Sequence, residues 1–165
     1  MRKFIFSVDV EEWYMAENIK PYVSDRQRLY SSIEAFEDLL KVLDEFDIKA
    51  TLFVVGRLLK EKSYRDLVQF AAKEGHEVAS HTMHHNMLTN LSFQETYNEI
   101  ANSISILEDT LGKKVYGFRA PCFTNNAHLE KCLKECGIVY TSNTIKAYKH
   151  DRYSVENIPS NIFDI

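Results

Sequence analysis

The sequence predicts an α/β fold in which mainly parallel strands pack against outer helices. Short β-rich runs alternate with longer helical patterns along almost the whole chain, as expected of a parallel sheet built from βα units. Three of these runs end in acids, histidines or an arginine, and functional residues gather at the carboxyl ends of strands in such folds. With no linker, low-complexity run or short repeat, we expect a single domain over residues 1–165.

Composition narrows the class of protein. Of the 165 residues, 45% are hydrophobic and 27% are charged, which indicates a globular chain with its own core. The net charge of −4 and the lack of a Lys/Arg run argue against nucleic acid as a partner. No apolar stretch approaches the roughly 20 residues of a transmembrane helix. The odd set Cys122, Cys132 and Cys136 predicts no disulfide framework, which favours a reducing, cytoplasmic location.

The first half of the chain predicts strands and helices in alternation. The opening strand covers residues 3–8, and an irregular segment over 15–30 follows it. Ser31 and Glu34 form the pattern of a capping box, behind which apolar residues recur at helical spacing. The remaining elements of this half are a buried strand at 49–55, a helix at 64–74 that stops at Gly75, and a strand at 76–79.

The second half contains the helix with the clearest pattern. Ser92 and Glu95 predict another capping box, and apolar residues then alternate in threes and fours as far as Gly112. A fourth strand is expected at 115–118. The last two expected elements are a helix capped by Asn125 or Asn126 that reaches Cys136, and a short strand at 138–141.

The strand at 76–79 leads directly into a cluster of histidines. His81 and His85 stand four residues apart, so one helical turn or a tight loop would bring both imidazoles to one side, whereas His84 would point elsewhere. Two imidazoles are half of a zinc-type site, and a carboxylate from the acidic end of the first strand would add a third ligand. This ligand set suits a first-row divalent metal, with Zn²⁺ the default.

These motifs resemble a known family. The order of an acidic motif, His81-Thr82-Met83-His84-His85 and Phe118-Arg119-Ala120-Pro121 is similar to the polysaccharide deacetylases of carbohydrate esterase family 4, of the nodulation-type deacetylase homology. The resemblance covers residues 4 to about 153. It implies a (β/α) barrel-like deacetylase fold, here a partial or distorted barrel because only five strands are expected.

The resemblance also implies a role for each matching residue. Asp9 would be the catalytic base that takes a proton from a metal-bound water, and Arg119 would orient Asp9 and hold its carboxylate bidentately. His81 and His85 would be metal ligands, and Thr82 would support the histidine loop by hydrogen bonding. The implied reaction is hydrolysis of an N-acetyl, sometimes O-acetyl, group of a saccharide with release of acetate.

Three further residues are assigned to substrate binding. Pro121 and Phe123 follow Arg119, and Trp13 follows the acidic motif. Trp13 could stack on a sugar ring, although an aromatic residue so close to a strand end is more often part of the core or its rim.

The chain departs from the family pattern at its acidic motif. The common pattern has two adjacent aspartates, but Val10 follows Asp9 here, so the third metal ligand must be Glu11 or Glu12. Glu11 is preferred because strand alternation returns it to the face of Asp9. For Glu12, a position on the surface is about as plausible as a ligand role.

A second departure concerns the general acid. The family carries a late Leu-x-His motif that this chain lacks, and His150 would be either a substitute acid or a packing residue. The chain therefore resembles the N-terminal two-thirds of a deacetylase, and open sheet edges predict a homo-oligomer or an ordered tail over the edge. Two alternative functions remain: a catalytically silent metal-holding module for sugar binding or assembly, and a hydrolase of small non-peptide amides.

Overall fold

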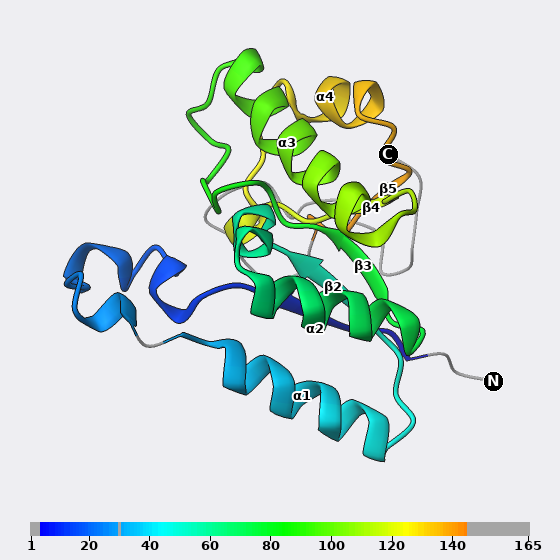
Figure 1. Ribbon diagram of the computed structural model, residues 1–165. Coiled ribbons are helices and arrows are strands. Elements are labelled where there is room, and N and C mark those ends of the chain that lie inside the picture. The colour runs from blue at the N-terminus through cyan, green and yellow to red at the C-terminus, as the bar shows by residue number, and fades with distance from the viewer. Residues whose placement is uncertain (1–3, 30, 145–165) are drawn as a thin grey trace.

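The computed structural model describes residues 4–29 and 31–144 and contains one sheet of five parallel strands (Figure 1). The strands are β1 (Phe6–Val10), β2 (Ala50–Val54), β3 (Glu77–Ser80), β4 (Gly117–Phe118) and β5 (Tyr140–Thr141). The α-helices are α1 (Ile33–Glu45), α2 (Lys62–Lys73), α3 (Phe93–Leu111) and α4 (Leu129–Glu135). Short 3-10 helices are η1 (Trp13–Met15), η2 (Lys20–Tyr22), η3 (Gln27–Leu29), η4 (Gly56–Lys60) and η5 (Pro121–Phe123).

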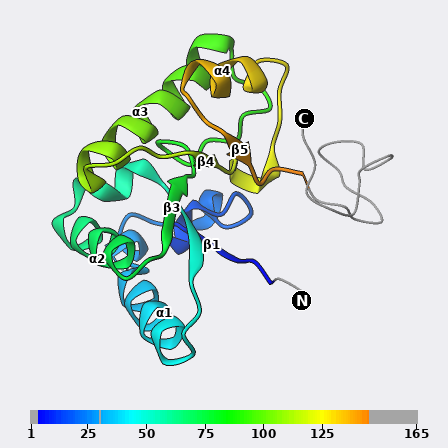
Figure 2. The ribbon, with the colours of Figure 1, turned by 90° about the vertical axis from the view of Figure 1, so that its right-hand side faces the viewer.

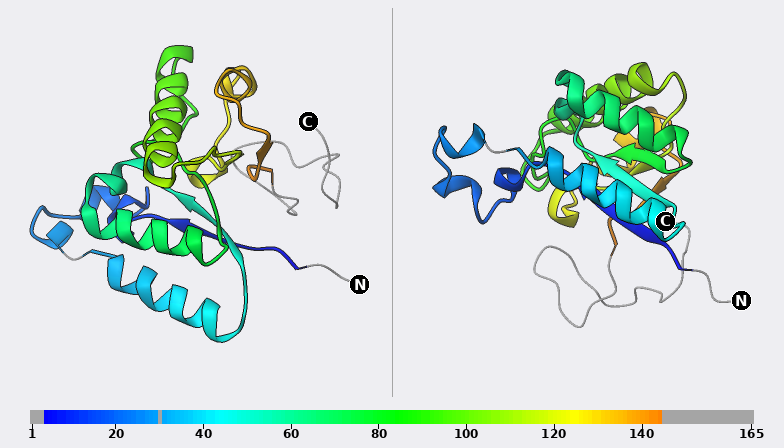
Figure 3. Two further views of the ribbon diagram at one scale, coloured as in Figure 1. Left: turned by 45° about the vertical axis from the view of Figure 1, so that its right-hand side comes forward. Right: turned by 60° about the horizontal axis from the view of Figure 1, so that its bottom comes forward.

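The strands lie in the sheet in the order in which they occur in the chain, and all neighbouring pairs are parallel. Crossovers of a single hand then place every connecting helix on the same face of the sheet. Figure 2 shows α1, α2, α3 and α4 in an arc around one side of the strands, and Figure 3 gives two more views of this arrangement. The predicted α/β fold with outer helices, an open part of a barrel, is confirmed.

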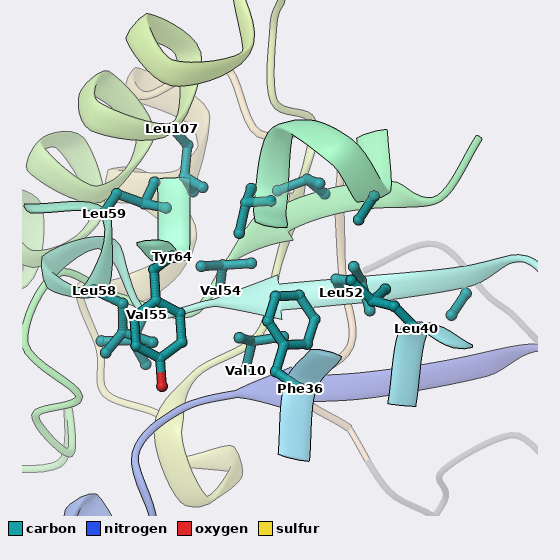
Figure 4. Close-up of a cluster of buried hydrophobic side chains, with 14 of the residues drawn as sticks. Val10, Phe36, Leu40, Leu52, Val54, Val55, Leu58, Leu59, Tyr64 and Leu107 are labelled. Carbon is teal, nitrogen blue, oxygen red and sulfur yellow. The ribbon is translucent and has the colours of Figure 1, made fainter. Parts of the chain in front are cut away.

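The larger core cluster lies between the sheet and the first two helices (Figure 4). Phe36 and Leu40 from α1 pack toward Leu52 and Val54 of β2, and all four side chains are buried. Complete burial of one such side chain is worth about 1.5–3 kcal/mol. β2 is buried at every position except the half-buried Thr51, which fits its largely apolar sequence without alternation.

A second cluster packs α3 against α4 and the short strand β4. It contains Ile100 and Ile104 of α3, Phe118 of β4, and Cys132 and Leu133 of α4. Within the described residues, Cys122, Cys132 and Cys136 form no disulfide, and Cys132 lies in this core as the sequence predicted. Within the part of the chain that the structure describes, no helix is long and apolar enough to cross a bilayer.

Element boundaries differ most from the sequence prediction at β1. The strand was expected to end at residue 8, but pairing with β2 continues to Val10, where Val10 faces Val54 and Asp9 faces Phe53. Asp9 is therefore part of the strand. Glu11 is the residue directly after Val10. The alternation of side chains between the two faces of the strand, which favours Glu11 over Glu12, therefore extends to the point where the chain leaves the sheet.

Two of the predicted helix caps are wrong. α1 begins one residue later than expected, and the Ser31–Glu34 capping box does not form, because the Ser31 hydroxyl donates a hydrogen bond to Glu12 Oε1 at 2.7 Å. α4 has His128 at its N-cap position, without a side-chain cap. Asn126 lies two residues earlier, where its Oδ1 accepts a hydrogen bond from the His128 N–H at 3.0 Å and its Nδ2 donates to the Leu88 carbonyl at 2.8 Å. The Ser92–Glu95 capping box of α3 is confirmed.

Candidate active site

The loop that follows β3 holds both histidines in a tight turn. Thr82 and His85 have positive φ angles of 63° and 60°, so the loop alternative is correct and the helical one is wrong. Thr82 Oγ1 accepts a hydrogen bond from the backbone N–H of His85 at 3.1 Å, which is the support that the sequence assigned to Thr82. The loop is also tied to η4, because the Gly56 N–H donates to the Thr82 carbonyl at 2.9 Å.

His81 is held in one orientation by the neighbouring strand end. Its Nδ1–H donates to the backbone carbonyl of Arg119 at 2.7 Å, which leaves the Nε2 lone pair free to act as a ligand. Nε2 lies 3.8 Å from Asp9 Oδ2. Burial lowers the pKa of His81, so the imidazole is neutral at pH 7, which is the form that can bind a metal.

Glu11, His81 and His85 form a cluster whose potential ligand atoms all lie within 4.8 Å of one another. Glu11 Oε2 is next to His85 Nε2, and the His81 and His85 ring centroids are 5.1 Å apart. Burial raises the pKa of Glu11, but the hydrogen bond from His85 and the electrostatic interactions with His85 and His81 outweigh it, so the pKa is lowered. The Glu11 carboxylate therefore has the charge of a metal ligand.

The atoms of this cluster fit a divalent cation. His85 Nδ1 is buried and has no hydrogen-bond partner among the described residues, and the buried Glu11 Oε2 has only the adjacent His85 Nε2 beside it. A buried carboxylate with so few polar neighbours costs free energy, which a cation bound by the carboxylate and both imidazoles would recover. Two imidazoles and one carboxylate are also a donor set that leaves positions open for water and substrate.

Asp9 and Arg119 meet beside the cluster, although they are 110 residues apart in the chain. Arg119 Nη1 donates to Asp9 Oδ1 at 2.7 Å. The expected bidentate contact is wrong, because Arg119 Nη2 donates instead to the hydroxyl groups of Ser7 at 2.8 Å and Ser142 at 2.7 Å. The guanidinium carbon also lies 4.1 Å from the centroid of the Phe53 ring. Arg119 is thus fixed from several sides and leaves Asp9 Oδ2 open toward His81.

Ser7, Phe53 and Ser142 were not identified from the sequence. Ser7 lies two residues before Asp9 on β1, so strand alternation could have placed the two side chains on one face. Ser142 directly follows β5, and its position at a strand end was the available signal. Phe53 had no signal, because an aromatic residue in an apolar run is indistinguishable from the other core residues.

Glu12 is neither a surface residue nor part of the metal cluster, so both interpretations of it are wrong. Its side chain is buried, and it accepts hydrogen bonds from the Ser31 hydroxyl and the Ser32 N–H, each at 2.7 Å, and from the Tyr64 hydroxyl at 2.8 Å. Burial raises the pKa of Tyr64, which keeps its hydroxyl a donor. Glu12 therefore links the end of β1 to the start of α1 and to α2.

The other residues assigned to the site have different surroundings. His84 points away from the cluster and bonds through Nδ1 to Glu99 Oε1 at 2.8 Å, as expected. Phe123 is half-buried, 5.5 Å from the Arg119 guanidinium carbon, and Trp13 is 36% exposed at the start of η1. Pro121 is buried in η5. The assignment of Trp13, Pro121 and Phe123 to substrate binding stays a prediction.

Three relatives illustrate what the chain is similar to. It is 32% identical over 99 residues to a peptidoglycan-N-acetylglucosamine deacetylase of Bacillus cereus, covering 60% of this chain and 45% of that protein. A CE4 family pseudoenzyme from Bacillus anthracis aligns with a TM-score of 0.65 and 18% identity, over 83% of this chain and 41% of its own. A family 4 acetyl xylan esterase from Clostridium thermocellum, in complex with a cobalt ion, aligns with a TM-score of 0.58 and 20% identity, over 78% and 53%.

The chain thus spans about half the length of these relatives or less. The two structural neighbours share the fold of the chain, which identifies its five strands with part of a barrel-like deacetylase fold. Residues 30–141, more than half of the chain, match the family model of polysaccharide deacetylases. His81, His85 and Arg119 lie inside that range, and Asp9 and Glu11 precede it. This chain belongs to the polysaccharide deacetylase family.

Proposed function

We propose that the chain carries a metal-dependent site that hydrolyses the acetyl group of an N-acetylated, or O-acetylated, saccharide and releases acetate. The observation that carries the proposal is the position of Asp9, held by Arg119, next to the cluster of Glu11, His81 and His85. The peptidoglycan deacetylase and the acetyl xylan esterase similar to this chain are named for that amide and ester chemistry. This support makes a saccharide the first substrate to test.

Asp9 is the general base of the proposed reaction. Its Oδ1 is occupied by Arg119, so Oδ2, which faces His81 Nε2 at 3.8 Å, receives the proton of the attacking water. The water oxygen adds to the acetyl carbon, the bond from that carbon to the sugar nitrogen breaks, and the proton passes to the leaving amine. Arg119 keeps the Asp9 carboxylate in one orientation during this transfer.

Glu11, His81 and His85 would hold the metal. A divalent metal there would lower the pKa of a water molecule and polarise the acetyl carbonyl, and zinc and cobalt are both compatible with the donor set. His81 contributes Nε2, because its Nδ1–H is committed to the Arg119 carbonyl. We propose zinc because it is the usual metal of such ligand sets.

The test of the proposed function is acetate release from an N-acetylglucosamine oligosaccharide after zinc or cobalt is supplied. We expect turnover by the wild-type chain and a loss of about 10²–10⁴-fold in kcat for Asp9→Asn, since a general base contributes a factor of this size. Asp38→Asn on the exposed face of α1 is the matched control and keeps wild-type turnover. Equal turnover by Asp9→Asn and the control would contradict the role of Asp9.

A silent metal-holding module is the second candidate, and one observation favours it. The described histidines outside the cluster have other contacts: His76 Nδ1 accepts from the Ala50 N–H, His84 bonds to Glu99, and the His128 ring packs on Phe93. The described residues thus offer no histidine to protonate the leaving amine, and His150 lies outside them. Saccharide binding without acetate release at any supplied metal would establish this candidate and contradict hydrolysis.

A further inference from the structure

A second binding feature lies beside the metal cluster. A pocket of about 150 Å³ opens next to His85 and is lined by residues from five separate segments of the chain. Its lining residues are Tyr14, Met15, Lys20, Arg28, Arg57, His84, His85 and Asn86. Three of them are cations, and none carries a carboxylate. We propose that this pocket binds an oxyanion group of the saccharide, a carboxylate or a phosphate, and so selects acidic substrates for the proposed deacetylase site.

The three cations come from different 3-10 helices, and two of them lie near the same aromatic ring. Lys20 lies in η2, Arg28 in η3 and Arg57 in η4. The guanidinium carbons of Arg28 and Arg57 each lie 6.0 Å from the centroid of the Tyr14 ring. Both arginines thus line the same pocket as this ring, where an anion would offset the repulsion between like charges.

Arg57 is the strongest of the three as an anion ligand. It is half-buried, and among the described residues no carboxylate is within ion-pair distance of its guanidinium group. Lys20 and Arg28 are more exposed and have partners outside the pocket lining, Glu17 at 3.4 Å and Asp25 at 3.7 Å. Exposed pairs of this length are weak, so both cations remain able to contact an anion.

The position of Arg57 relative to His85 is fixed by the backbone. The Arg57 N–H donates to the Met83 carbonyl and the Gly56 N–H to the Thr82 carbonyl, each at 2.9 Å, so η4 is bonded directly to the histidine loop. A Cβ at Gly56 would stand 3.0 Å from both Met83 Sδ and Ser103 Cα, so glycine permits this close approach. Arg57 and His85 are therefore held by backbone segments that are hydrogen-bonded to each other.

The chemistry of the lining favours an oxyanion over a neutral hydroxyl group. A guanidinium group presents planar N–H donors that match the oxygens of a carboxylate or a phosphate, and hydrogen bonds between opposite charges are roughly twice as strong as neutral ones. A saccharide whose acidic group occupies the pocket would extend past His85, next to the cluster. The pocket thus adds selectivity for acidic saccharides to the proposed acetyl hydrolysis.

Equilibrium binding separates this inference from the proposed function, because no turnover is needed. The probes are N-acetylglucosamine as the neutral sugar, N-acetylmuramic acid for a carboxylate and N-acetylglucosamine 6-phosphate for a phosphate, titrated by NMR. Arg57→Gln removes the main cation. Lys60→Gln on the same 3-10 helix is the matched control, because Lys60 is exposed and outside the pocket lining. Arg57→Lys restores a positive charge without the planar fork.

We expect the wild-type chain to bind an acidic probe about tenfold more tightly than the neutral sugar, with the advantage reduced at high salt. Arg57→Gln should lose about five- to tenfold in affinity for that acidic probe only, Arg57→Lys should recover part of it, and Lys60→Gln should match the wild type. The acidic probe whose affinity falls in Arg57→Gln shows whether the pocket binds a carboxylate or a phosphate.

Equal affinities of the wild-type chain for neutral and acidic probes would overturn the inference, as would equal losses in Arg57→Gln and Lys60→Gln. Selective binding of an acidic probe without any acetate release would support the pocket and contradict the hydrolase. Hydrolysis without preference for acidic sugars would support the hydrolase and contradict the pocket.

Discussion

Glu11 and Glu12 are adjacent in the sequence, but their surroundings in the structure differ completely. Glu11 lies in the cluster with His81 and His85, whereas Glu12 is 3% exposed and accepts three hydrogen bonds from Ser31, Ser32 and Tyr64. Two consecutive side chains of extended chain point in opposite directions, so one faces the site and the other faces the core. Glu12 thereby fixes the backbone from which Glu11 extends.

The first prediction concerns this buried carboxyl group. Glu12→Gln should lower the free energy of unfolding by about 1–3 kcal/mol, because the amide NH₂ replaces an oxygen that accepts hydrogen bonds and leaves a buried donor unpaired. Urea unfolding followed by circular dichroism measures the change. Glu45→Gln, an exposed acid at the end of α1, is the control and should be neutral. A Glu12→Gln chain as stable as this control would show that the hydrogen bonds contribute nothing.

Among single residues, the sequence predicted the side chains with distinctive chemistry. Asp9, His81, His85 and Arg119 stand at strand ends, and the structure brings them together. The destination of Glu12 could not be predicted, because its partners Ser31 and Tyr64 are 19 and 52 residues away. Whether Ser31 and Tyr64 come within hydrogen-bond distance of Glu12 depends on how α1 and α2 pack, and no local sequence pattern encodes that packing.

At the scale of elements, β3 is joined to β2 by a buried histidine. His76, just before β3, accepts a hydrogen bond at Nδ1 from the Ala50 N–H at 3.1 Å, at the start of β2. Burial lowers the pKa of His76 from 6.5. Since protonation would destroy the acceptor, the contact requires the neutral imidazole.

This contact predicts a pH dependence of stability. Because the pKa of His76 is lower in the folded chain, the unfolded chain binds more protons below pH 6.5, so stability rises with pH in this window and is lost as the pH falls below 6.5. His76→Asn keeps an acceptor oxygen without a titrating group, so its free energy of unfolding should fall less between pH 8 and pH 5.5. If the free energy of unfolding fell equally with pH in the wild type and in His76→Asn, His76 would not be the source of the pH dependence. Effects from other histidines cancel in the comparison.

Helix ends that are set by residues of the helix itself were predicted well. Helix ends whose capping residues bond to a distant segment were not. α3 has its capping box at Ser92 and Glu95 and its left-handed Gly112, all within its own sequence. The N-cap of α1 is different, because the Ser32 hydroxyl accepts from the Trp13 N–H at 2.9 Å instead of capping the helix. Competition from a segment 19 residues away decided the outcome, and propensity could not show it.

At the scale of the whole molecule, the site exists only when the sheet is assembled. Glu11 follows β1, His81 follows β3 and Arg119 follows β4, so three strands must be in register before the ligand and base atoms meet. Because all neighbouring strands are parallel, their carboxyl ends lie at the same end of the sheet. β1 and β5 form the outer edges of the described sheet, and the homo-oligomer expected from open edges stays a prediction.

The central claim is that Glu11, His81 and His85 bind one divalent metal ion, and the most direct test is the metal content of the purified chain by elemental analysis. The wild-type chain is compared with the double variant His81→Ala/His85→Ala after incubation with zinc and dialysis. His84→Ala/His128→Ala is the matched control, because it removes two histidines outside the cluster. We predict about one metal ion per chain in wild type and control, and loss of that metal in the cluster variant. Equal metal in both double variants, or none in the wild type, would contradict the account.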